Sequence, residues 1–376
     1  MNNSPSQTAK GGNGLPADQP SLAGNGQTSI ISPEDPILVT GAAGFIGARV
    51  VEDLLNRGFR NIVCFARPSG RLARIEQIRS RRPEAQIRLI QGNLLSRQDC
   101  EMASKDVALI IHLAAGTGEK SFPDAYMNSV VTTRNLLDAS LACGRLRRFV
   151  LISSFSVYTN CQKPHGRLLD EACPMEAHGH LRGEAYCFAK FKQEELLREY
   201  HQKFGVPYVV VRPGSVYGAG RDAIVGRVGI DTFGLFLHIG GPNRIPFTYV
   251  DNCADAIVLA GLVKGVDGEV FNVVDDDLPT SRQFLRWYKK NVGSFRSVYV
   301  PHLVSYLLCY LWEKYSQWSE GQLPPAFNRR RWHTYWKRTE YSNEKLKTRL
   351  GWTPQVPTAE GLRRYFEGCR QNGKHA

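Results

Sequence analysis

A tyrosine and a lysine four residues apart, Tyr186 and Lys190, form a pair that could move protons. On a helix, residues at this spacing lie on one face, one turn apart. A phenol has an ordinary pKa of about 10, so service as a base near neutral pH requires about 4 kcal/mol of stabilisation of the phenolate. A nearby ammonium favours the phenolate. The pair therefore predicts proton transfer at a substrate hydroxyl, with Tyr186 as acid or base and Lys190 lowering its pKa.

A group of serines follows the apolar segment 148–153 and comes before this pair. It contains Ser153, Ser154 and Ser156. A hydroxyl beside the reacting oxygen can polarise a carbonyl or orient an alcohol, so we expect a catalytic serine in this group. This context also distinguishes Tyr186 from two other tyrosine–lysine pairs of the same spacing. Those pairs are Tyr310 with Lys314 and Tyr341 with Lys345.

A glycine-rich turn follows the first apolar segment and opens a helical pattern. It reads Gly41-Ala42-Ala43-Gly44-Phe45-Ile46-Gly47. The first glycine permits a tight turn, the second lets the backbone approach a pyrophosphate, and the third lets helix and sheet pack closely. The N-terminus of the helix then offers N–H groups to the phosphates. The turn predicts a dinucleotide site that includes Gly41, Gly44, Phe45, Ile46 and Gly47.

The next apolar segment, 61–66, bears on which dinucleotide is bound. An acidic residue at its end would hold the ribose 2′-hydroxyl of NAD, and an arginine would accommodate the 2′-phosphate of NADP. The segment continues into Arg67, with no acidic residue there. We therefore expect NADP or NAD as cofactor, with Arg67 favouring NADP.

Apolar segments alternate with helical patterns over the first half of the chain. This alternation predicts crossover units and a doubly wound parallel sheet of the α/β class. We expect a disordered tail at 1–33, a dinucleotide-binding domain at 34–212, and a smaller mixed substrate-binding region at 213–370 that also returns segments to the sheet. The expected strands are 36–40, 61–66, 86–91, 107–113, 148–153 and 208–212, and the expected helices are 44–57, 125–142 and 185–203.

Composition narrows the kind of partner. The chain has 376 residues and a formal charge of +13, but its basic residues are spread out and no zinc-finger or helix-turn-helix pattern accompanies them. We expect a small-molecule substrate rather than nucleic acid, no metal site, and a cytoplasmic protein because the nine cysteines have no disulfide-like spacing. The apolar segment 303–312 is too short to span a membrane. It is either a buried helix or, with the basic and aromatic residues up to 337, a membrane-surface patch.

The ordered set of motifs resembles the extended short-chain dehydrogenase/reductase family, also called the NAD-dependent epimerase/dehydratase family. The resemblance covers about residues 36–365, and its C-terminal part is similar to 3β-hydroxysteroid-dehydrogenase-like members. The motifs that carry it are Gly41-x-x-Gly44-x-x-Gly47, His112-Leu113-Ala114-Ala115, Asn128 ahead of Asn135-Leu136-Leu137, Ser153-Ser154 with Val157-Tyr158, Tyr186-x-x-x-Lys190, Arg212-Pro213-Gly214-x-x-Tyr217-Gly218 and Tyr249-Val250-Asp251-Asn252.

The resemblance implies a Rossmann-type fold and a role for individual residues. Ser154 matches the catalytic hydroxyl, Tyr186 the acid/base and Lys190 the ribose-binding lysine. Asn93 stands where the family usually has an aspartate that contacts adenine, which weakens that assignment. Phe155-Ser156 replaces the acidic pair of the 4,6-dehydratases, so dehydration is not expected. The remaining cofactor contacts that the resemblance implies are Leu94, Leu113, Ala114, Ala115 and Pro213.

Three interpretations of function stay open. The first is an epimerase or dehydrogenase of a nucleotide sugar. The second is a dehydrogenase of a hydrophobic alcohol, similar to 3β-hydroxysteroid dehydrogenases, and the third is a dinucleotide sensor without catalysis. The sensor is disfavoured because both Tyr186 and Lys190 are present. We also consider a homodimer as a partner arrangement. The candidate substrate contacts are Thr117, Tyr158, Arg221 and Arg227.

Overall fold

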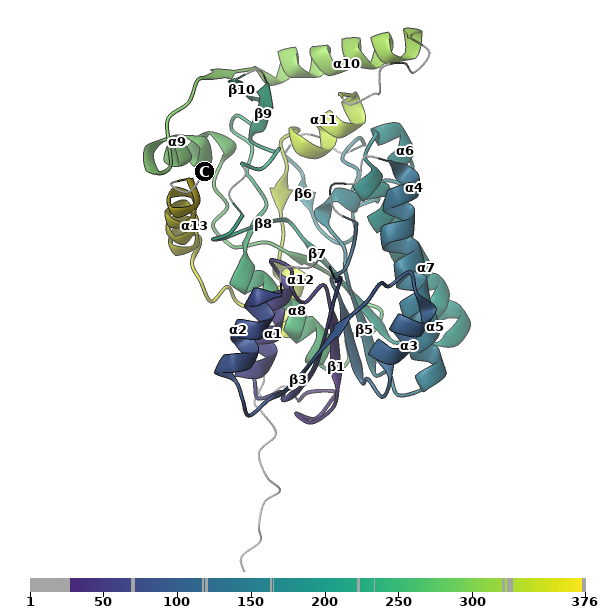
Figure 1. Cartoon of the computed structure of the whole chain (residues 1–376). Helices are drawn as coiled ribbons and strands as arrows, with labels where there is room; N and C mark the ends of the chain where they lie inside the picture. The colour runs from purple at the N-terminus through teal and green to yellow at the C-terminus, as the bar shows by residue number, and fades with distance from the viewer. Residues whose placement is uncertain are drawn as a thin grey trace, which may run out of the picture.

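A seven-stranded sheet forms the centre of the molecule, and every neighbouring pair of its strands is parallel (Figure 1). Its order is β12-β7-β5-β4-β1-β2-β3, so the chain builds outward from β1 and then crosses back to β4. The sheet comprises β1 (Ile37–Thr40), β2 (Asn61–Ala66), β3 (Gln86–Gln91), β4 (Leu109–His112), β5 (Arg148–Ile152), β7 (Tyr208–Pro213) and β12 (Val270–Val273). The computed structural model describes residues 28–68, 72–116, 118, 121–162, 164, 166–221, 224–232, 234–319, 322 and 327–373.

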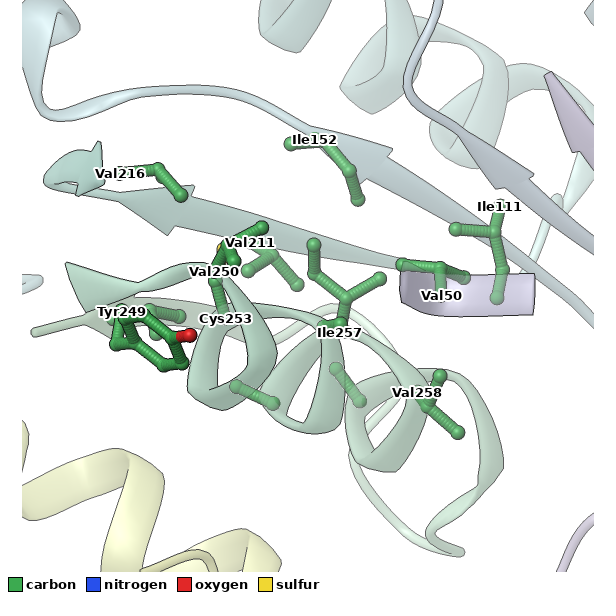
Figure 2. Close-up of a cluster of buried hydrophobic side chains, with 14 of the residues drawn as sticks. Val50, Ile111, Ile152, Val211, Val216, Tyr249, Val250, Cys253, Ile257 and Val258 are labelled. Carbon is green, nitrogen blue, oxygen red and sulfur yellow. The ribbon is translucent and has the colours of Figure 1, made fainter. Parts of the chain in front are cut away.

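Helices cover both faces of this sheet, which is why its inner strands are continuously apolar. On one face α8 packs against α1 and the strands, through the side chains that Figure 2 shows around Val211 and Ile257. On the other face α3, α5 and α7 enclose a second cluster that includes Leu136 and Leu197. These helices are α1 (Gly47–Asn56), α2 (Ala73–Arg81), α3 (Arg97–Ser104), α5 (Thr132–Cys143), α7 (Ala185–Phe204) and α8 (Val250–Leu262).

The helix expected at 125–142 is composite. It consists of α4 (Phe122–Ala125), a π-helical turn η1 (Tyr126–Val131) and α5. A π-helical turn inside a helix is rare and often marks a functional site. Here η1 packs against α7, the helix that carries Tyr186 and Lys190.

The second half of the chain adds small sheets above the central one and returns one strand to it. Strand β12 pairs with β7 at the edge of the large sheet. The small sheets are β13-β10-β9, β11-β8 and β14-β6. Their strands are β6 (Leu168–Leu169), β8 (Ser215–Tyr217), β9 (Gly229–Thr232), β10 (Leu235–His238), β11 (Phe247–Tyr249), β13 (Ser297–Tyr299) and β14 (Glu340–Tyr341). The other helical segments are the 3-10 turn η2 (Phe155–Val157), α6 (Gly179–Arg182), α9 (Ser281–Asn291), α10 (His302–Trp318), α11 (Arg329–Tyr335), α12 (Glu344–Leu350) and α13 (Thr358–Gly373).

The last residues of the expected disordered tail lie against the core in the structure. The backbone N–H of Ile30 donates to the carbonyl of Leu262 at 2.9 Å, and Ile31 is buried. The apolar side chain of Ile31 accounts for this, because it joins the core cluster that also contains residues of α8. Residues 1–27 of the expected tail lie outside the described residues.

The segment expected at 303–312 is helical, but the interpretation of a buried helix is wrong. Helix α10 lies at the top of the molecule in Figure 1, and Leu303 keeps 80% of its surface exposed. The small side chains of Ser305 and Cys309 face inward instead. In the part of the chain that the structure describes, no helix is long and apolar enough to cross a membrane.

Candidate functional site

The predicted site residues gather at one edge of the central sheet. Parallel strands end at the same edge, and ligands of doubly wound sheets bind where the strand order reverses, here between β1 and β4. Gly41 follows β1, Leu113 follows β4, and Ser154 stands two residues beyond β5. Pro213 ends β7. Residues from four separate segments are thus brought to a single edge.

The glycine turn after β1 leaves no room for a side chain at Gly41 or Gly47. Gly41 has a φ of +70°, and a β-carbon there would come within 3.1 Å of the backbone nitrogen of Ala114. A β-carbon on Gly47 would lie 2.2 Å from the Gly41 carbonyl oxygen. The turn is closed by a hydrogen bond from the Gly44 N–H to that same oxygen, at 2.9 Å. This backbone cradle at the start of a helix fits a pyrophosphate, with Phe45 and Ile46 on its rim.

A buried histidine holds the segment after β4 against this cradle. The ring of His112 lies 2.8 Å from Oγ1 of Thr40 and 3.0 Å from Oγ1 of Thr133. Thr40 also accepts the backbone N–H of Ala114 at 3.2 Å, and Gln193 donates to Thr133 at 2.7 Å. Burial lowers the pKa of His112 to about 3, so the ring is neutral. The network joins β1, β4, α5 and α7, and fixes the loop that includes Ala115.

The phenol of Tyr186 is hydrogen-bonded to Ser154, so the structure brings the two predicted catalytic groups together. Burial raises the pKa of Tyr186, whereas the bond to Ser154 and the positive charge of Arg221 lower it. Ser154 is itself oriented by the backbone N–H of Ser156, which donates to its Oγ at 3.1 Å. Two hydroxyl groups are therefore positioned to bind one substrate oxygen.

Lys190 lies one turn further along α7 and is almost entirely buried. Its Nζ donates to the carbonyl of Ile152, the last residue of β5, at 2.7 Å and lies 5.9 Å from the centre of the Tyr186 ring. Burial lowers the pKa of Lys190 to about 7, and the charge of Glu194 opposes that shift. An ammonium so close to titration near neutral pH responds strongly to a ligand that brings hydroxyls or charge.

Tyr158 does not line a pocket, which corrects the prediction that it contacts substrate. Its side chain is 1% exposed, and its hydroxyl donates to Oδ1 of Asn272 at 2.7 Å. Nη1 of Arg212 donates to the same hydroxyl at 2.8 Å, and Arg212 also pairs with the buried Glu194. Burial raises the pKa of Tyr158 well above its usual value. A phenol fixed on both sides in this way connects strands β7 and β12 to the end of β5.

Arg221 and Arg227 occupy different environments. Arg221 is exposed and follows β8. It lies near enough to Tyr186 for its positive charge to lower the pKa of the phenol. Arg227 is buried: its Nη1 donates to the carbonyl of Thr334 at 2.8 Å, and its guanidinium lies 5.2 Å from the centre of the Tyr335 ring. Arg221 is therefore the more accessible of the two for an anionic substrate.

The remaining predicted contacts follow the ends of β2, β3 and β4. Arg67 is exposed just beyond the end of β2. Asn93 is exposed after β3, and its Oδ1 accepts the backbone N–H of Leu95 at 3.0 Å. Leu94 is buried, and its carbonyl accepts from Asn135 at 3.0 Å. Thr117 lies outside the described residues.

Sequence reasoning missed Glu194, although a signal for it was available. It lies four residues after Lys190 on the same face of α7 and is fully buried. Its Oε1 accepts from Ser153 at 2.6 Å and from Nε of Arg212 at 2.9 Å. A carboxylate at i+4 from a buried lysine, in a chain with a strand-ending arginine, was the pattern that could have revealed it. Through these bonds Glu194 links Ser153, just after β5, to Arg212 of β7.

One family model and several known proteins are similar to this chain. The sequence model of the NAD dependent epimerase/dehydratase family matches residues 37–273. The uncharacterized UDP-glucose epimerase YtcB of Bacillus subtilis (strain 168) is 28% identical over 252 residues, which cover 63% of this chain and 76% of that protein. The 3beta-hydroxysteroid-dehydrogenase/decarboxylase isoform 2 of Arabidopsis thaliana is 26% identical over 364 residues, which cover 88% and 61%.

A solved structure extends the likeness to the whole fold. The UDP-glucuronic acid 4-epimerase of Bacillus cereus, crystallised in complex with NAD, superposes with a TM-score of 0.66 and 23% identity over 90% of this chain and 99% of that one. The superposition confirms the doubly wound α/β fold predicted from the sequence.

Proposed function

Because the chain belongs to the NAD dependent epimerase/dehydratase family, we propose that it catalyses reversible hydride transfer at a secondary alcohol or ketone of a nucleotide sugar. The observation that carries this proposal is the hydrogen-bonded pair of Ser154 and Tyr186 at the sheet edge that also bears the glycine cradle. A bound nicotinamide dinucleotide supplies the hydride acceptor. The chain's own residues supply proton transfer and orientation.

Each residue of the pair has a separate task. The phenol of Tyr186 takes the proton from the substrate hydroxyl or returns it to the carbonyl oxygen, while Ser154 donates a hydrogen bond to the same oxygen. Lys190 holds its Nζ 5.9 Å from the centre of the Tyr186 ring and keeps its own orientation through the Ile152 carbonyl. In the protein alone the pKa of Tyr186 is raised by burial, so positive charge is needed to make the phenolate accessible near neutral pH.

The nucleotide-sugar substrate is supported by charge at the site. Arg221 is exposed and its charge reaches Tyr186, so an anionic group beside the reacting hydroxyl would have a partner. The names of two of the relatives above, UDP-glucose epimerase and UDP-glucuronic acid 4-epimerase, describe substrates of this chemical class. An exposed Arg67 at the end of β2 supports use of NADP as well as NAD.

A hydrophobic secondary alcohol is the second candidate. Two observations favour it: the exposed apolar surface of α10, and a match to the hydroxysteroid dehydrogenase that spans 88% of this chain, against 63% for the YtcB protein. A sensor without catalysis is the remaining alternative, and it would have no need of the Ser154–Tyr186 pair.

Incubation of the full chain with NAD or NADP and either a UDP-hexose or a 3β-hydroxysteroid tests these proposals. Changed stereochemistry of the sugar without accumulation of reduced cofactor would support an epimerase. Net cofactor reduction with the sugar would support a dehydrogenase, and reduction with the steroid alone would favour the second candidate. Cofactor binding without turnover of either substrate class, unchanged in Tyr186→Phe, would favour the sensor and overturn the proposal.

A further inference from the structure

Helix α10 exposes its apolar side chains and buries its small ones. Trp318 is 77% exposed, and its ring is stacked with that of Tyr315 at 5.7 Å between centroids. The buried positions of the helix include Ser305, Cys309 and Ser316. The exposed apolar residues, which recur at helical spacing along one face, are Leu303 (80%), Val304 (45%), Leu307 (52%), Leu308 (56%), Leu311 (53%), Tyr315 (48%) and Trp318 (77%).

This arrangement is the reverse of an ordinary surface helix, which turns its apolar stripe to the core. The inward face packs on α11, where Nε1 of Trp332 donates to Oγ of Ser305 at 2.9 Å. That hydrogen bond fixes the rotation of α10, because turning the leucines inward would break it and displace the small residues from the contact. The packing of α10 on α11 therefore keeps the apolar ridge facing outward. A contiguous exposed apolar ridge of this kind marks an interaction surface.

The segment that ends in the ridge carries a net positive charge. Residues 281–318 contain six lysine or arginine residues and one acidic residue. The acidic residue, Glu313, forms an ion pair with Arg329 at 3.0 Å, so its charge is already balanced. The exposed basic residues in this stretch are Arg282, Arg286, Lys290, Arg296 and Lys314.

From these observations we propose that α10 docks the protein on a membrane surface that contains anionic lipids. The ridge enters the headgroup region parallel to the bilayer plane. The basic residues of α9 and α10, with Arg296 just before β13, meet the lipid phosphates. With 17 residues the helix is about 25 Å long and carries serines on its inner face, so it lies on the bilayer rather than across it. Trp318 and Tyr315 have the amphipathic rings that favour the interface.

Charge also decides between a membrane and a second copy of the chain. Residues 281–318 contain six basic residues and one acidic residue, so pairing two copies through this segment brings like charges together, which is unfavourable. Anionic headgroups neutralise the same charges. The proposal does not depend on the identity of the substrate, because it rests on α10 and its neighbours alone.

Vesicle flotation of the full chain tests the proposal. We expect the protein to float with vesicles of phosphatidylcholine and phosphatidylglycerol in equal parts, and much less with phosphatidylcholine alone. Leu307→Glu/Leu311→Glu should lower binding by about tenfold or more for each leucine removed, since burying such a side chain changes an equilibrium constant by at least that factor. Arg286→Gln/Lys290→Gln/Arg296→Gln should abolish the preference for the anionic vesicles.

Matched controls separate docking from loss of fold or of charge in general. Met102→Glu/Phe204→Glu replaces two apolar residues of similar exposure, 50% and 56%, in α3 and α7, and should float like the unaltered protein. Arg97→Gln/Lys105→Gln/Arg134→Gln removes three exposed basic residues elsewhere and should keep the anionic preference. Cofactor binding should be unchanged in all four variants.

Two outcomes would overturn the proposal. One is an unaltered protein that stays at the bottom of the gradient with both vesicle types. The other is a protein that dimerises in sedimentation experiments, becomes monomeric in Leu307→Glu/Leu311→Glu, and fails to float. That second result would assign the ridge to a second copy of the chain.

Discussion

The ammonium of Lys190 lies 5.9 Å from the centre of the Tyr186 ring, yet it donates its hydrogen bond to the carbonyl of Ile152 at 2.7 Å. The lysine is therefore held by the end of β5, two residues before Ser154, and not by the tyrosine itself. One strand end positions both partners of the phenol. This arrangement keeps Nζ of Lys190, whose pKa burial lowers to about 7, beside the ring while the phenol stays hydrogen-bonded to Ser154.

Replacing Tyr186 should separate catalysis from binding. We expect Tyr186→Phe to lower kcat by about 100-fold or more, the usual contribution of a positioned acid or base, and to leave binding of reduced cofactor, measured by fluorescence titration, nearly unchanged. Tyr310→Phe is the matched control, because Nζ of Lys314 lies 6.0 Å from the centre of that ring on α10. An equal loss of turnover in both variants would contradict the assignment of Tyr186.

Closing the glycine cradle should impair both folding and cofactor binding. A β-carbon on Gly47 would lie 2.2 Å from the Gly41 carbonyl oxygen, so Gly47→Ala must displace backbone at a cost of about 1–3 kcal/mol. Gly293→Ala is the control, since nothing lies within 4 Å of its β-carbon position. Urea melts and cofactor titrations check both variants. A Gly47→Ala protein that binds the dinucleotide normally would show that the cradle does not hold the pyrophosphate.

Removing the arginine after β2 should change the choice of cofactor. Arg67→Ser should weaken NADP about tenfold or more and leave NAD nearly unchanged, because a hydrogen bond to a charged phosphate contributes at least that factor. Arg60→Ser, at the opposite end of β2 and also exposed, serves as control. The dissociation constants of both reduced cofactors provide the measurement. An equal change in the dissociation constants of NAD and NADP would show that Arg67 does not bind the 2′-phosphate.

Tyr158→Phe should affect stability and spare substrate binding. The variant loses a hydroxyl that Asn272 and Arg212 both use in the core, so we expect about 1–3 kcal/mol of destabilisation. KM should stay within about twofold, as the side chain is buried. Arg221→Gln, at an exposed position, should show the opposite pattern of raised KM and unchanged stability. A large rise in KM for Tyr158→Phe would show that Tyr158 contacts the substrate after all.

The sequence predicted what local patterning controls. Strands β2 and β3 have the predicted bounds, because each is a short apolar or alternating segment between turn residues. Strand β12 was not located, since Val270–Val273 follows a stretch without alternation and becomes a sheet strand only by pairing with β7. The resemblance pointed to Ser154 and Tyr186, which lie 32 positions apart and meet only through the fold.

Local sequence patterns could not predict long-range polar contacts or which face of a helix packs against the protein. The hydroxyl of Tyr158 meets Asn272 across 114 positions, and nothing in either neighbourhood indicates the other. For α10 the apolar stripe was visible in the sequence, but periodicity alone does not say which face packs. The contact of Trp332 with Ser305 decides that question.

The buried His112 should make the protein sensitive to acid. In the unfolded chain this ring takes up a proton near the ordinary histidine pKa of 6.5, whereas burial lowers the folded pKa to about 3. Between these values the unfolded state binds more protons, so stability falls as the pH is lowered from 6.5 toward 3. From about pH 7 to about pH 4 the loss amounts to on the order of 3 kcal/mol.

His112→Gln isolates this contribution, because a glutamine can still hydrogen-bond Thr40 or Thr133 but does not titrate. The variant should be less stable than the unaltered protein at neutral pH, since its shorter reach in the network leaves one hydroxyl poorly paired. Its stability should fall less on acidification, so that the two free energies of unfolding converge or cross at low pH. Urea melts across the acidic range measure both curves. Parallel curves would mean that His112 is already protonated in the folded protein, and the neutral ring that links Thr40 to Thr133 would have to be abandoned.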